Sequence, residues 1–207
     1  VSAVFLYVLY MEGILTCDLY IPFFNVRFYI QPPVYLLFSM FIIVGTVNAV
    51  NLTDGIDGLS ASVTIPVMVF FAAVALKVNR EELAVLPGAM IGGLIAFLGL
   101  NWHPAKAFMG DTGSLFMGGV VCGLAYALDM PLVLIFAGFV YLMETLSVIL
   151  QVSYFKLTHG KRLFKMSPIH HHFEMSGWKE EKIVLTFAGV SAVMCVVAWL
   201  SISGIVG

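Results

Sequence analysis

Seven stretches of the chain are almost free of charged side chains and approach the ~17–25 residues that a helix needs to cross a bilayer. They lie at residues 1–16, 34–50, 59–77, 84–101, 114–129, 131–155 and 183–205. A backbone inside lipid must satisfy its own hydrogen bonds, so such segments must be helical. The sequence therefore predicts an all-α, polytopic integral membrane helical bundle with about seven transmembrane helices.

The composition supports this class. Hydrophobic residues make up 61% of the 207 residues and charged residues only 11%, whereas soluble domains hold roughly 25% charged residues. The net charge of −2 comes with no basic stripe, which gives no indication of a nucleic-acid partner. The cysteines Cys17, Cys122 and Cys195 form no CxxC pair, so we expect free, buried thiols.

Two of the seven segments are unusual. The first is short, and the chain begins with Val1 inside an apolar run, so we expect a single transmembrane domain over residues 1–207 that is truncated at its N-terminus. The sixth contains Glu144 and Gln151. We therefore expect this segment to bend or to extend beyond the bilayer.

The basic residues predict the orientation of the bundle. If the segments alternate, one side carries the connections 17–33, 78–83 and 129–131, and the other carries 48–58, 101–113 and 156–182. The first side has three Lys and Arg residues when Lys77, at the end of the segment 59–77, is counted with Arg27 and Arg80, and the second has seven. By the positive-inside rule the second side is cytoplasmic. The three most polar strings, NLTDGIDG, NWHPAKAFMGDTGS and SPIHHHFE, all lie on that side.

The first of these strings places Asn51, Asp54 and Asp57 three residues apart. An ordinary helix boundary with a turn at Asp54 is one explanation. A glycosylation acceptor at Asn51 does not suit a cytoplasmic loop, and a calcium loop would need alternating oxygen ligands. Because carboxylates at membrane depth are costly and usually line a polar cavity, the alternative is a functional site.

The second string suits a metal–phosphate site. Gly110 and Gly113 allow a close approach of the backbone, and Ser114 can cap a helix that begins near it. The free amides at a helix N-terminus attract phosphate, but Asp111 would repel it unless a divalent cation lay between them. Mg²⁺ typically takes one or two carboxylates together with substrate phosphates. A capped turn without a ligand is the alternative.

The third string contains His170, His171 and His172 in a loop that also holds Lys161, Arg162 and Lys165. Adjacent histidines cannot all face the same way. Together with the basic residues they suit a diphosphate. A structural zinc site and a solvated loop that meets anionic lipid headgroups are the alternatives.

Taken together, these strings closely resemble the phospho-N-acetylmuramoyl-pentapeptide transferases. The matching stretches are VGTVNAVNLTDGIDGLSA, NWHPAKAFMGDTGSLFMGG, METLSVILQVSYFK and PIHHHFE, in the order of the family. The resemblance covers essentially the whole chain, from about the fourth of the ten spans expected in the family to the last. It implies a cytoplasmic active site in the bacterial inner membrane.

The resemblance also implies an activity. The family transfers phospho-MurNAc-pentapeptide from UDP-MurNAc-pentapeptide to undecaprenyl phosphate, which gives lipid I and UMP in peptidoglycan synthesis. Mg²⁺ is the implied cofactor, the lipid bilayer is the implied environment, and a homodimer remains open.

Residue roles follow from the same resemblance, position by position. Asp111 matches the magnesium ligand, and Asp54 and Asp57 match acids needed for activity and nucleotide contact. Phe108, which on its own favours a core position, matches an aromatic that stacks on uracil. The remaining matches are the phosphate-contacting His170, His171 and His172 and the substrate-pocket residues Asn51, Asn101, Gly110 and Gln151.

One part of the family pattern is missing. The family has an Asp-Asp pair followed by lysine in an earlier cytoplasmic loop, and this chain contains no such pair. We expect it upstream of Val1, which leaves the activity of the chain on its own open. A related polyprenyl-phosphate GlcNAc-1-phosphate transferase, a proton-coupled transporter that uses Asp54, Asp57 and Glu144, and an inactive structural remnant are the alternative functions.

Overall fold

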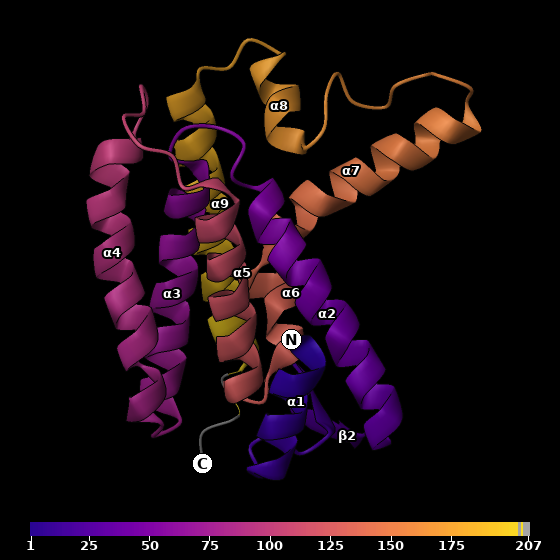
Figure 1. Cartoon of the computed structure of the whole chain (residues 1–207), viewed down its shortest axis with the longest axis vertical. Helices are drawn as coiled ribbons and strands as arrows, with labels where there is room; N and C mark the ends of the chain where they lie inside the picture. The colour runs from indigo at the N-terminus through magenta and orange to yellow at the C-terminus, as the bar shows by residue number, and fades with distance from the viewer. Residues whose placement is uncertain (203, 205–207) are drawn as a thin grey trace.

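The computed structural model, which describes residues 1–202 and 204, is a bundle of helices with one small β-hairpin (Figure 1). Four segments are long and apolar enough to cross a membrane: α2 (Pro32–Leu52), α3 (Leu59–Lys77), Glu81–Asn101 and α9 (Glu180–Ser201). The third of these comprises the 3-10 turn η1 (Glu81–Leu83) and helix α4 (Val85–Asn101). The end of the expected span 183–205, at residues 203 and 205, lies outside the described residues. The chain is thus a multi-pass membrane protein.

Helix α3 lies at the centre of the bundle and α4 lies at its edge. About 61% of the apolar window of α3 is buried inside the protein, against 11% for Glu81–Asn101. The central helix packs against α4, α9 and α5 (Gly110–Ala127). Its internal Pro66 is tolerated because neighbouring helices can re-satisfy the freed backbone groups. The exposed side chains of α4 are apolar, as a lipid-facing helix requires.

The expected bend in the sixth segment is confirmed. The 3-10 turn η2 (Pro131–Val133) and α6 (Leu134–Ala137) meet α7 (Phe139–Leu157) at an angle of 83°. A Cβ atom on Gly138, at the break, would come within 2.7 Å of the Leu134 carbonyl oxygen, so only glycine fits here without movement. Beyond the break, α7 leaves the bundle and points away from it (Figure 1).

Fewer than seven of the described helices are both long and apolar enough to be candidate spans. Helix α1 (Ser2–Met11) has only ten residues, and α5 begins with the polar run Gly110 to Ser114, which lowers its hydropathy. The structure has four candidate spans among the described residues, or five if the bent pair is one span. The predicted fold class, an all-α membrane bundle, is confirmed.

A two-stranded hairpin that the sequence analysis did not predict occupies part of the 17–33 connection. Strand β1 (Asp18–Ile21) pairs antiparallel with β2 (Val26–Tyr29). The turn between them contains Phe23 and Asn25, both with positive φ. An ion pair of 2.8 Å between Arg27 and Asp129 ties the hairpin to the turn after α5.

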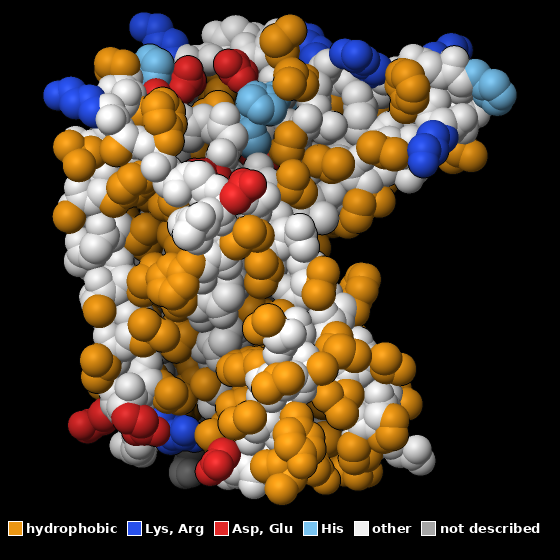
Figure 2. Space-filling model, in the orientation of Figure 1, with side chains coloured by type: hydrophobic (Ala, Val, Ile, Leu, Met, Phe, Trp, Pro, Cys, Tyr) orange, Lys and Arg blue, Asp and Glu red, His pale blue; other side chains and the backbone are white. Residues whose placement is uncertain are grey.

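The three polar loops gather at the opposite end of the bundle from this hairpin (Figure 1). One loop joins α2 to α3, one joins α4 to α5, and one runs from α7 through α8 (Ile169–Glu174) to α9. Figure 2 shows charged side chains concentrated at the two ends and histidines only at the end with the three loops, with a mainly hydrophobic surface between the ends. The predicted convergence of the three loops is therefore confirmed.

Candidate active site

The end of α2 meets the start of α5, and polar side chains fill the junction. The Nδ2 atom of Asn51 donates to Oδ1 of Asp111 at 3.0 Å and to the hydroxyl of Ser114 at 2.8 Å. Ser114 is buried and in turn donates to the carbonyl oxygen of Gly110 at 3.1 Å. Asn51 therefore fixes the position of the Asp111 carboxylate in the first turn of α5.

Asp54, in the turn that follows α2, belongs to the same junction. Its pKa is raised above the usual value because the carboxyl group is partly buried and, second, because the negative charge of Asp111 lies nearby. Two carboxylates that disfavour each other's charge form a region where a divalent cation is favoured. Oxygen ligands of this kind suit Mg²⁺, so Asp54 and Asp111 fit the expected cofactor.

The first turn of α5 also suits an anion. Gly110 has φ +64°, a left-handed conformation that glycine adopts without strain, and it starts the helix directly before Asp111. The unpaired amides of a first helical turn attract phosphate. Phe108, two residues earlier, is 77% exposed, so its ring is free to stack on a planar ligand.

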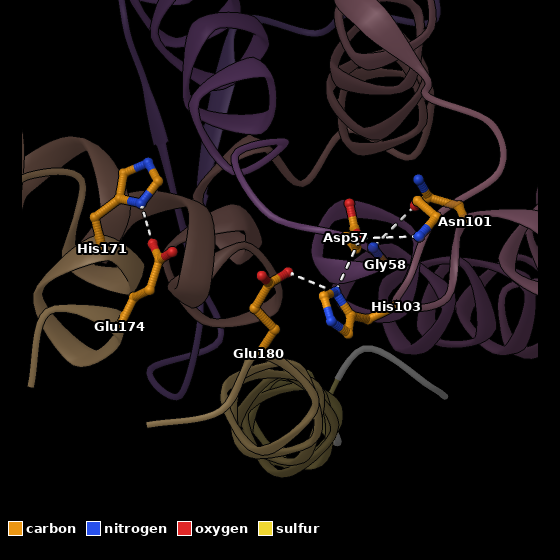
Figure 3. A network of polar contacts seen from close by, with 8 residues as sticks. Asp57, Gly58, Asn101, His103, His171, Glu174 and Glu180 are labelled. Atoms are coloured by element: carbon orange, nitrogen blue, oxygen red, sulfur yellow. Dashed lines mark hydrogen bonds and ion pairs between the residues drawn. The ribbon is translucent and has the colours of Figure 1, made fainter. Parts of the chain in front are cut away.

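A second polar cluster lies beside the first and joins Asp57 to His103 and Glu180, two residues that the sequence analysis did not single out. Oδ2 of Asp57 lies 3.0 Å from Nδ1 of His103 and accepts a hydrogen bond of 2.9 Å from the Ala105 amide. Oε2 of Glu180, at the start of α9, lies 3.2 Å from the same ring nitrogen. Figure 3 shows the three side chains pointing toward one another from three separate elements.

Asn101 and Gln151 hold loops in place through their amides. Buried Asn101 accepts from the Gly58 amide at 3.0 Å and donates to the Ala107 carbonyl at 2.8 Å. Gln151 accepts from the Leu163 and Phe164 amides and donates to the Phe164 carbonyl. Substrate contact by either side chain stays a prediction, while their role in shaping the loops follows from these bonds.

The three histidines have three different environments, as their adjacency predicted. His170 is fully buried, with Nδ1 3.0 Å from Oε2 of Glu144, so Glu144 is a buried, paired acid. His171 contacts Glu174 at 2.7 Å and is partly exposed. Nδ1 of His172 accepts from the Lys165 amide at 3.1 Å.

His170 also contacts the first loop. A Cβ atom on Gly55 would overlap its Nε2 atom, so the imidazole packs directly against the backbone between Asp54 and Asp57. The third loop is thereby joined to the first, just as Asp57 and Ala105 join the first to the second. A cavity of about 360 Å³ lies between the end of α7 and the third loop, and two of its lining side chains, Lys156 and Arg162, are basic. The other lining residues are Gln151, Val152, Phe155, Met166 and Ser167.

The sequence contained only part of the signal for the second cluster. His103 stands in the NWHPAKAF string, but histidine beside proline in a loop has no distinctive pattern. Glu180 looks like an ordinary acidic residue in the first turn of a helix, where it is favoured by the helix dipole. Only the fold brings Glu180 close to His103 and Asp57, which lie more than 70 positions earlier in the chain.

Comparisons with known proteins place the chain among transferases. A family described as "Glycosyl transferase family 4" matches residues 1–129. The phospho-N-acetylmuramoyl-pentapeptide-transferase of Clostridium acetobutylicum is 50% identical over 185 residues, which cover 89% of this chain and 58% of the relative. The protein of the same name from Caldanaerobacter subterraneus is 52% identical over 186 residues, covering 90% and 58%.

A third relative with that name, from Carboxydothermus hydrogenoformans, is 50% identical over 189 residues. The chain spans a little under three fifths of the length of these relatives, 57% or 58%. The family match covers the α2–α3 and α4–α5 loops, where Asn51, Asp54 and Asp111 meet. The chain therefore belongs to glycosyl transferase family 4.

Proposed function

We propose that the chain forms the cytoplasmic-face active site of a phospho-N-acetylmuramoyl-pentapeptide transferase in the bacterial inner membrane. Its substrates would be UDP-MurNAc-pentapeptide and undecaprenyl phosphate, and its products lipid I and UMP. The observation that supports this most directly is the hydrogen bond from Asn51 to Asp111, beside Asp54, in a chain about half identical to transferases of that name.

In the proposed reaction, an oxygen of undecaprenyl phosphate forms a bond to the β-phosphorus of UDP-MurNAc-pentapeptide. The bond from that phosphorus to the bridging oxygen breaks, and UMP leaves with the oxygen and its electron pair. The reaction exchanges one phosphoanhydride bond for another. Positioning and electrostatic stabilisation are therefore the main contributions that the protein has to supply.

Several of the predicted residues have a place in this proposal. Asp111 and Asp54 would hold Mg²⁺, which when bound neutralises charge that develops on the diphosphate. The first-turn amides of α5 would bind phosphate oxygens, and the exposed ring of Phe108 would stack on uracil. His171 and His172 would contact the diphosphate from the third loop. Asp57 would contact the nucleotide.

The position of the carboxylates favours an enzyme over the transporter alternative. Carriers place their charged residues near the middle of the membrane on broken helices. Asp54, Asp57 and Asp111 instead lie in or beside loops at one end of the bundle. Glu144 is engaged with His170, so it is not free to form a relay with the other acids.

Product analysis tests the proposed function. The intact protein, as its gene encodes it, should convert UDP-MurNAc-pentapeptide and undecaprenyl phosphate into lipid I and UMP in detergent micelles with Mg²⁺. UDP-GlcNAc offered in place of the muramoyl substrate should give no lipid-linked product. Transfer from UDP-GlcNAc alone would favour the GlcNAc-1-phosphate transferase instead.

A further inference from the structure

One oxygen of the Asp57 carboxylate is anchored and the other is not. Oδ2 accepts a hydrogen bond from the Ala105 amide at 2.9 Å and lies 3.0 Å from Nδ1 of His103. Oδ1 makes no hydrogen bond within the part of the chain that the structure describes, and the side chain is 20% exposed. The contacts at Oδ2 thus fix the carboxylate and leave Oδ1 available to accept a hydrogen bond from a ligand.

His103 joins Asp57 to α9. Its Nδ1 atom lies 3.2 Å from Oε2 of Glu180 as well as 3.0 Å from Asp57. Because an ionised carboxylate only accepts hydrogen bonds, Nδ1 must carry the hydrogen in this arrangement. The ring is held between two acids from separate elements, as Figure 3 shows. Glu180 therefore limits the positions that the imidazole can take, and the imidazole in turn limits those of Asp57.

The neighbouring acids also favour a positive charge on the ring. The pKa of His103 is raised above its ordinary value of 6.5, chiefly by the hydrogen bond with Asp57 and also by the negative charges of Glu180, Glu181 and Asp57. These carboxylates act on the imidazole from the α2–α3 loop and from the first turn of α9. A charged ring holds a carboxylate more strongly than a neutral ring does, so the anchoring of Asp57 weakens as the pH rises through the raised pKa.

We propose that His103 and Glu180 are positioning residues for the nucleotide. His103 holds Oδ2 of Asp57, Glu180 holds His103, and Oδ1 of Asp57 is thereby presented to a hydrogen-bond donor of the nucleotide. The inference rests on the proposed function, in which Asp57 contacts the nucleotide. It adds that the start of α9 acts on the affinity for the nucleotide through His103, and that this affinity depends on pH.

An effect of this kind belongs to binding and not to the transfer step. Asp57 contacts the nucleotide equally in the ground state and in the transition state, so poorer positioning raises KM and leaves kcat nearly unchanged. A cluster that only stabilised the fold would behave differently. Its loss would lower Tm and the amount of active protein, while KM for the remaining active protein stayed the same.

Nucleotide binding by the intact protein tests the inference. UMP is titrated by calorimetry in detergent with Mg²⁺, and KM and kcat for UDP-MurNAc-pentapeptide are measured alongside. In His103→Leu we expect the affinity for UMP to fall by about three- to tenfold, which matches the loss of one hydrogen bond. KM should rise by a similar factor, and kcat should stay within about twofold of its original value.

A conservative variant separates the hydrogen bond from the charge. His103→Asn places an amide donor near the position of Nδ1 but cannot take up a proton, so its KM at neutral pH should rise less than that of His103→Leu. In the unaltered protein KM should rise between about pH 6 and about pH 9, as the ring loses its charge. In His103→Asn this rise with pH should be clearly smaller.

Glu180→Gln and Glu181→Gln form a matched pair in the first turn of α9. Glu180 contacts the ring at 3.2 Å, whereas Glu181 acts on it through charge. Glu180→Gln should therefore raise KM by about two- to threefold, and Glu181→Gln should leave it nearly unchanged.

Three results would overturn the inference while lipid I formation stayed intact. These are equal affinity for UMP in the unaltered protein and in His103→Leu, an equally steep rise of KM with pH in His103→Asn, and equal effects of the two glutamate variants. If the unaltered protein neither binds UMP nor forms lipid I, the proposed function itself fails, and the inference fails with it.

Discussion

Oε2 of Glu144 lies 3.0 Å from Nδ1 of His170, and both side chains are fully buried. The pair joins α7 to α8, and the opposite edge of the imidazole packs against Gly55. His170 therefore acts on the Asp54–Asp57 loop through packing. This separates it from His171 and His172, which are partly exposed.

Removing Glu144 should destabilise the fold. A buried pair that loses one partner typically costs about 3–5 kcal/mol, because the other partner is left without compensation. We expect Glu144→Ala to lower the free energy of unfolding in SDS titrations by about that amount. Glu174→Ala removes the exposed partner of His171 and should change the free energy of unfolding by less than ~1 kcal/mol. Equal effects of the two substitutions would contradict the assigned role of the pair.

A methyl group at Gly55 should disturb the site. Gly55→Ala places a Cβ atom onto Nε2 of His170, so either the imidazole or the loop must move. We expect lower transferase activity and a lower Tm. Gly99→Ala, in α4, is the matched control, since nothing lies within 4 Å of its Cβ position. In a His170→Ala background, Gly55→Ala should lower Tm by less than it does in the unaltered protein, because the clash is gone; an equal loss in both backgrounds would speak against the contact.

Asn51 should matter for catalysis where Asn48 does not. Asn51 donates to Asp111, whereas Asn48, one turn earlier, donates to the Val44 carbonyl of its own helix at 2.7 Å. A hydrogen bond to a charged group is worth about 1.5–3 kcal/mol, which corresponds to about 10- to 100-fold in rate. Steady-state rates at fixed Mg²⁺ should fall by that factor in Asn51→Ala and stay near normal in Asn48→Ala.

The pKa of Asp54 gives a prediction with a definite sign. Because burial and the charge of Asp111 raise the pKa above its ordinary value of 3.8, the folded state disfavours the ionised carboxylate. The resulting destabilisation is absent at pH values well below 3.8, grows as the pH rises from 3.8 towards the raised pKa, and is complete above it. Asp54→Asn should therefore raise Tm near neutral pH, and this gain should vanish in acid. A gain that grew as the pH fell would contradict this environment for Asp54.

Much of the fold was predictable because lipid imposes strong rules on sequence. The apolar segments 34–50, 59–77 and 84–101 correspond closely to helices, and Glu144 with Gln151 indicated the bend that the structure has at Gly138. The hairpin was not predicted, because its strands of four residues each are too short for a recognisable alternation. Among the described helices, α1 and α5 do not count as candidate spans, because α1 is short and α5 begins with polar residues.

For the site, the sequence predicted which loops meet but not how their side chains pair. Asn51, Asp54 and Asp111 were predicted to share a pocket, and the hydrogen bond between Asn51 and Asp111 brings them together. The pairing of Glu144 with His170, and that of His103 with Glu180, depends on how α7 and α9 are placed. Such contacts between distant elements leave no local pattern.

The central claim is that Asp111 holds the catalytic cation, and the most direct test is the Mg²⁺ dependence of lipid I formation in the intact protein. Asp111→Asn keeps the size of the side chain and removes its charge, while Asp18→Asn, in the hairpin at the far end of the bundle, is the matched control. We predict that Asp111→Asn abolishes Mg²⁺-dependent transfer and that Asp18→Asn transfers normally. Near-normal turnover of Asp111→Asn across the Mg²⁺ titration would contradict the account.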